Sequence, residues 1–165
     1  MTKRTAFLAL ALAACSGLSA QSVKLNDLDY FEDTGVNYLV YSNGYNGMFC
    51  DETTAAVEII LRGVRIATGG GIRLMNTPEQ WDIYPTLDSR TVDKESQTIE
   101  CVLGYEQYGF TPRIKVTPKD KGVLMSVYVD KPVPESLVGK AGMNIEFFPA
   151  TYFGKTFMVD GMPDI

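Results

Sequence analysis

The chain has 165 residues, of which 45% are hydrophobic and 21% are charged, and its formal net charge is −5. This composition is typical of a folded globular protein and excludes an intrinsically disordered chain. The acidic balance and the scattered Lys and Arg residues also exclude a nucleic-acid-binding protein, which needs a concentrated basic surface. The chain has no histidine, so the commonest general base and transition-metal ligand is missing.

Residues 1–20 are predicted to be a signal peptide. Lys3 and Arg4 precede an apolar run over 5–14, which is shorter than the roughly 20 residues that a membrane-spanning helix needs. Signal peptidase would cut after Ala20. Alternatively, "LAAC" (12–15) resembles a bacterial lipobox, in which Cys15 would carry a lipid and attach the chain to the outer membrane. Either way we expect an exported protein in the periplasm or outside the cell.

Beyond the signal peptide, short β-strands are predicted in chain order. They are "VNYLVYS" (36–42), "AAVEIILRGVRIAT" (55–68, two strands broken at Gly63), "IRL" (72–74), "SRTVD" (89–93) and "TIECVLGY" (98–105) around a "KESQ" loop, "FTPRIKVT" (110–117) and "GVLMSVYVD" (122–130) around a five-residue "PKDKG" loop, "MNIEFF" (143–148) and "TFMVDG" (156–161). Only "PESLVGK" (134–140) favours a short helix. This pattern predicts an all-β protein, an antiparallel β-sandwich. Residues 21–165 would form one domain. The sequence ends directly after a strand-like run, so we expect that the chain is cut inside this domain.

The run Gly69, Gly70 and Gly71 is interpreted as a turn or a bulge. A phosphate-binding loop needs a helix directly after its glycines, and here a strand-like "IRL" follows. Trp81 and Tyr84 lie just beyond.

Aromatic rings suggest one candidate binding function. Trp81, Tyr84, Tyr45 and Tyr108 are candidates for stacking on sugar rings. The structural alternative is favoured for each of them, because a lone Trp commonly anchors a core and Tyr commonly lies at the edges of β-sandwiches.

Cysteines and carboxylates suggest neither a metal site nor a catalytic site. Cys50 and Cys101 would form a disulfide in an oxidising compartment or remain two buried thiols. The acidic stretch 26–33 lacks the spacing of a calcium loop and is interpreted as solvated. Neighbouring acids, such as Asp93 with Glu95, do not form the facing pair that glycoside hydrolysis requires. We therefore expect no catalytic residue, metal or cofactor in this chain.

Three stretches carry a family resemblance and together cover most of residues 25–165. They are "LNDLDYFEDTGVNYLVYSNGYNGMF" (25–49), "GVRIATGGGIRLMNTPEQWD" (63–82) and "VYVDKPVPESLVGKAGMNIEFFPATYFGKTFMVDG" (127–161). They resemble the N-terminal region of secreted glycoside hydrolase family 9 (cellulase-like) proteins of Bacteroidetes-type bacteria. The resemblance implies an all-β accessory domain followed by an immunoglobulin-like module and a catalytic (α/α)6 barrel. That barrel holds the acids of an inverting hydrolase, and no such residue falls within this sequence.

The expected function is therefore that of a non-catalytic N-terminal β-domain in a secreted, β-glucan-degrading enzyme. Its partners would be the downstream modules of the same protein and, through its aromatic residues, β-glucan. Two other expectations remain open: a free-standing carbohydrate-binding or adhesion module, and a structural surface lipoprotein anchored through Cys15.

Overall fold

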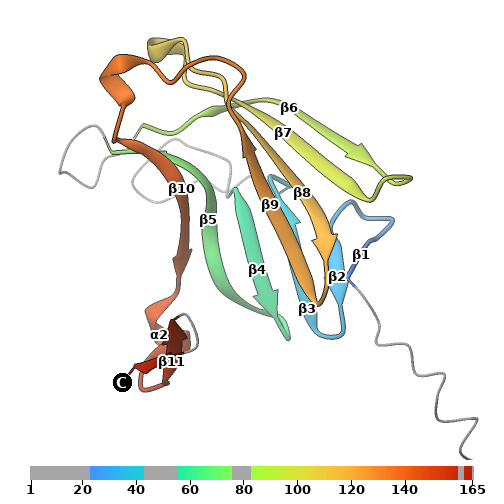
Figure 1. Ribbon diagram of the computed structural model, residues 1–165. Helices are drawn as coiled ribbons and strands as arrows, with labels where there is room; N and C mark the ends of the chain where they lie inside the picture. The colour runs from blue at the N-terminus through green and yellow to red at the C-terminus, as the bar shows by residue number, and fades with distance from the viewer. Residues whose placement is uncertain (1–22, 43–55, 76–82, 160–161, 165) are drawn as a thin grey trace, which may run out of the picture.

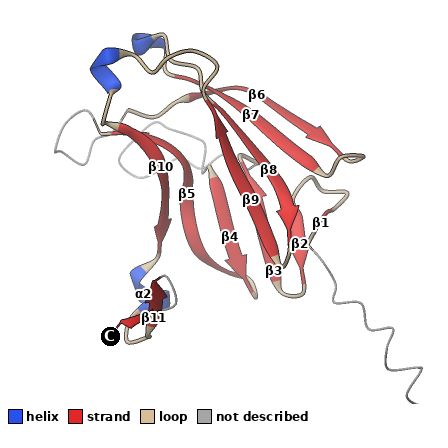
Figure 2. Cartoon of the chain, in the orientation of Figure 1, coloured by secondary structure: helices blue, strands red, loops and turns tan. Residues whose placement is uncertain are grey.

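The structure is a computed structural model that describes residues 23–42, 56–75, 83–159 and 162–164. Two antiparallel sheets face one another and enclose a hydrophobic core, as Figure 1 shows. Strands dominate the described residues, and the helical segments are single short turns (Figure 2). The predicted all-β sandwich is confirmed. No helix among the described residues has the length and apolar character needed to cross a bilayer.

The larger sheet has six strands in the order β1-β2-β3-β4-β5-β10. These are β1 (Lys24–Leu25), β2 (Phe31–Asp33), β3 (Val36–Val40), β4 (Val57–Leu61), β5 (Val64–Leu74) and β10 (Ala141–Phe147). The first five strands follow one another along the chain, and β10 returns from the far end of the sequence to pair with β5.

The smaller sheet has four strands in the order β6-β7-β8-β9. They are β6 (Thr86–Asp93), β7 (Thr98–Gly104), β8 (Arg113–Lys119) and β9 (Gly122–Tyr128). A separate hairpin, β11 (Phe157–Val159) with β12 (Met162–Asp164), follows the short helix α2 (Pro149–Tyr152). This terminal segment lies beyond the end of β10, outside the two facing sheets (Figure 1).

The predicted break at Gly63 is a tight hairpin turn between β4 and β5. Arg62 and Gly63 both have positive φ, 50° and 81°. Two consecutive residues of this kind match the twist of a two-residue hairpin, and glycine adopts the conformation without steric cost.

The other two predicted hairpins are also present. "KESQ" joins β6 to β7 as predicted, and Asp93 accepts the backbone amides of Glu95 (2.9 Å) and Ser96 (3.1 Å) within that loop. The five-residue "PKDKG" loop was wrong in length: Pro118 and Lys119 belong to β8, and only Asp120 and Lys121 form the turn.

The glycine run lies inside β5, so a bulge is confirmed and a turn is wrong. Both neighbouring strands lose register opposite this segment, because β5 carries an extra residue there, and Gly69 has a φ of 63°. A Cβ on Gly70 would lie 2.8 Å from the Cβ of Val57, and one on Gly71 would lie 2.5 Å from the hydroxyl of Tyr41. The three glycines therefore serve backbone conformation and close packing.

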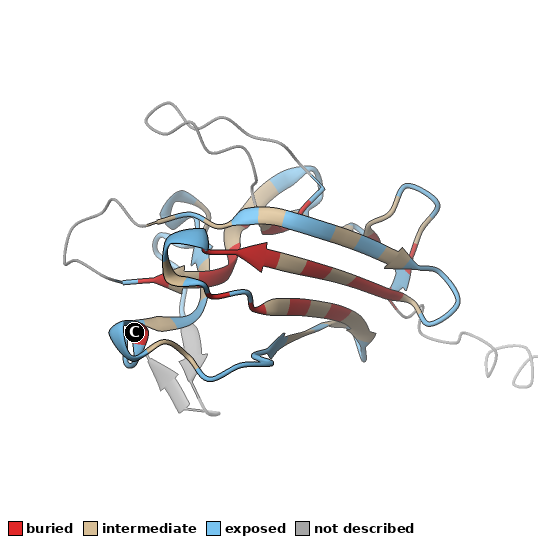
Figure 3. Ribbon diagram, turned by 90° about the horizontal axis from the view of Figure 1, so that it is seen from above, coloured by how far each residue is buried: buried red, intermediate tan, exposed pale blue. Residues whose placement is uncertain are grey.

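The core fills the space between the two sheets. Buried residues alternate with less buried ones along the strands that face it (Figure 3), which is the period of two that the sequence predicted. Its members include Val23, Leu25, Phe31, Val40, Leu74, Ile99, Leu103, Tyr105, Ile114 and Val116. The hydroxyl of Tyr105 donates a hydrogen bond to the backbone carbonyl of Ile72 (2.5 Å), which ties the smaller sheet to β5.

The helix predicted over 134–140 is a single 3-10 turn, η2 (Glu135–Leu137). Its one buried side chain, Leu137, belongs to the core. Pro134 precedes the turn and Gly139, with a φ of 76°, follows it, so the segment has no room for a regular α-helix.

Candidate functional site

The four predicted sugar-stacking residues differ in whether the structure describes them and in how exposed they are. Trp81 and Tyr45 lie outside the described residues. Tyr84 lies just before β6 with 52% of its surface exposed, whereas Tyr108, in the 3-10 turn η1 (Glu106–Tyr108), packs partly buried against the core. Of the two that the structure describes, only Tyr84 presents a largely exposed ring.

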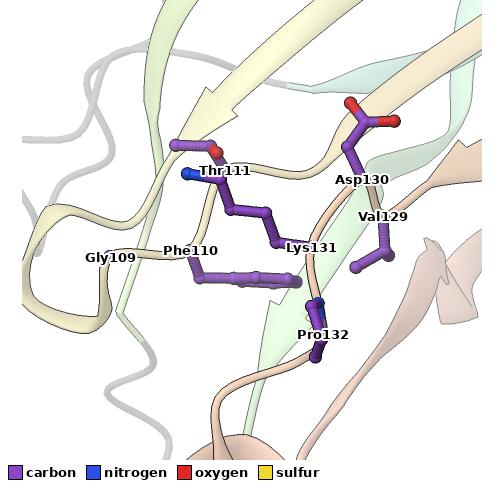
Figure 4. A pocket seen from close by; sticks show the side chains of 7 residues that line it. All are labelled: Gly109, Phe110, Thr111, Val129, Asp130, Lys131 and Pro132. Atoms are coloured by element: carbon purple, nitrogen blue, oxygen red, sulfur yellow. The ribbon is translucent and has the colours of Figure 1, made fainter.

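A small pocket of about 150 Å³ lies between the segment after η1 and the end of β9 (Figure 4). It is lined by Gly109, Phe110, Thr111, Val129, Asp130, Lys131 and Pro132. Figure 4 shows Phe110 and Pro132 on its apolar side and the Asp130 carboxylate pointing away from them. Asp130 is the only carboxylate that lines it.

Asp130 is held by Arg113. The guanidinium donates to both carboxylate oxygens of Asp130, at 2.9 and 3.0 Å, and to Glu100 at 2.9 Å, and it stacks over the ring of Tyr128. These hydrogen bonds from Arg113 lower the pKa of Asp130 below its ordinary value. A general acid needs the opposite shift, because it must hold its proton near neutral pH. The arrangement is an ion-pair network on the sheet and offers no acid for glycoside hydrolysis.

The acidic stretch 26–33 forms ion pairs. Asp29 contacts Lys94 at 2.6 Å and Glu32 contacts Lys24 at 3.8 Å. Within the part of the chain that the structure describes, no three His, Cys, Asp or Glu side chains are placed to hold a metal ion. Asp93, a second acid singled out by the sequence, has a lowered pKa because the Ser96 hydroxyl donates to it, and it serves the hairpin loop.

Cys101 is buried on β7, inside a strand as the sequence predicted. Its predicted partner Cys50, like the lipidation candidate Cys15, lies outside the described residues, so the disulfide stays a prediction. Burial raises the pKa of the Cys101 thiol to about 12, so it is protonated at neutral pH and unreactive.

Cys101 should therefore resist alkylation in the native protein near pH 8, and should react once guanidinium unfolds the chain without any reductant. Mass spectrometry of the peptide that contains Cys101 measures this. Labelling that appears only after a reductant is added would show that Cys101 is held in a disulfide.

An exposed aromatic surface, which sequence reasoning missed, lies around α2. We call Phe148, Tyr152 and Phe153 the α2 surface; their exposed fractions are 37%, 39% and 90%. Tyr152 also meets Phe147 edge to face at 5.5 Å. Pro149 occupies the first position of α2, and the backbone amide of Phe153 closes the turn by donating to Pro149 at 2.8 Å. The sequence signal was present in "EFFPATYF" but reads equally well as the interior of a strand.

Several exposed aromatic residues within one short segment are typical of interaction surfaces. The α2 surface is therefore the strongest candidate among the described residues for contact with another protein module. Comparisons with family models, with curated proteins and with solved structures found no match to this chain.

Proposed function

We propose that the chain is the non-catalytic N-terminal β-sandwich of an exported, β-glucan-degrading protein of the glycoside hydrolase family 9 type. In this role it packs against a neighbouring module of the same protein and helps to position it. The signal peptide predicted over residues 1–20 would deliver the protein to the periplasm or the cell exterior, with a lipid on Cys15 as the alternative route to the outer membrane.

The α2 surface is the observation that carries this proposal. Phe153 is almost fully exposed and directly follows α2, a short helix that lies beyond the sandwich (Figure 1). Packing against a second module would remove this apolar area from water, which contributes about 25 cal/mol per Å² of apolar surface buried. Asp130, the one carboxylate that lines the pocket of Figure 4, is held by Arg113.

The resemblance gives further support through its position in the fold. The three family-like stretches include β2 and β3, β5, and β10 of the six-stranded sheet, and the third stretch also includes the end of β9, η2, α2 and β11. The second and third stretches pair directly, because β5 and β10 are neighbours. An all-β domain is what the resemblance implies for this region, so the all-β fold supports the proposal.

The purified exported chain should release no reducing sugar from soluble β-glucan and should migrate equally fast in native gels with and without that polysaccharide. Release of reducing sugar by the chain alone would contradict the non-catalytic proposal. An unrelated β-sandwich protein that does not bind β-glucan serves as the mobility control.

A carbohydrate-binding module is the second candidate, and the exposed ring of Tyr84 favours it. Aromatic faces stack on the apolar faces of sugar rings. The same native gels distinguish the two candidates. If β-glucan slows the migration of the wild-type chain and of Tyr152→Ala but not that of Tyr84→Ala, the carbohydrate-binding candidate is favoured over the accessory role.

A further inference from the structure

We draw no further inference here: the strongest candidate, the edge strand β10 with the exposed side chains of Met143 and Phe147, pairs only with β5 among the described strands, and nothing in the structure shows what covers its other side.

Discussion

Replacing Tyr105 with alanine should lower the free energy of unfolding by about 3–5 kcal/mol, the range typical of removing a buried aromatic side chain. Tyr105 is 1% exposed, its ring stacks on Phe110 with centroids 5.8 Å apart, and its hydroxyl bonds to the carbonyl of Ile72. The variant therefore loses core packing and the link between the smaller sheet and β5 together. Chemical denaturation followed by fluorescence or circular dichroism measures the change.

Tyr105→Phe separates the two contributions. It keeps the ring but leaves the buried Ile72 carbonyl without this donor, which should cost about 1–3 kcal/mol. The account expects Y105F to lie between wild type and Y105A. A loss below about 1 kcal/mol for Y105A would mean that the ring does not fill the core as the structure places it.

Gly70→Ala should destabilise the chain by about 1–3 kcal/mol, because a well-packed core resists an added methyl group. The new Cβ would lie 2.8 Å from the Cβ of Val57 and 2.9 Å from its backbone oxygen. The backbone oxygen cannot move away as the end of a flexible side chain would, so β4 or β5 must shift. Thermal unfolding of the purified variant reports the effect.

Gly122→Ala is the matched control for this substitution. Gly122 opens β9, and a Cβ there would meet nothing nearer than the Tyr38 hydroxyl, at 3.7 Å, which is ordinary van der Waals contact. G122A should therefore change stability little. Equal losses from G70A and G122A would contradict the close approach of β5 to β4 and point to a general intolerance of alanine in these strands.

The fold class could be predicted because its signals are local. Alternation in "VNYLVYS" and "TIECVLGY" and the loop "KESQ" indicate strands and a hairpin without knowledge of distant residues. The glycine run was ambiguous because a bulge and a turn use the same residue type. The close approaches of Gly70 to Val57 and of Gly71 to Tyr41 decide between them, and these residues lie far apart in the sequence.

The candidate surfaces were harder to predict, since exposure depends on which sheet covers which strand. The sequence predicts a strand over "MNIEFF" but not its position in a sheet. That strand, β10, lies at the edge of the larger sheet because it pairs with β5, which is distant in the sequence. Residue type and a position near turns indicated the aromatic candidates for sugar stacking, but neither signal gives the burial that separates Tyr84 from Tyr108.

The DNA sequence that follows codon 165 tests the central claim most directly. If the chain is the accessory β-sandwich of a family 9 type enzyme, the reading frame should continue into an immunoglobulin-like module and then an α-helical module that carries the catalytic acids. A stop codon directly after Ile165 in intact DNA would contradict that account, and the β-glucan-binding candidate would then become the one to test.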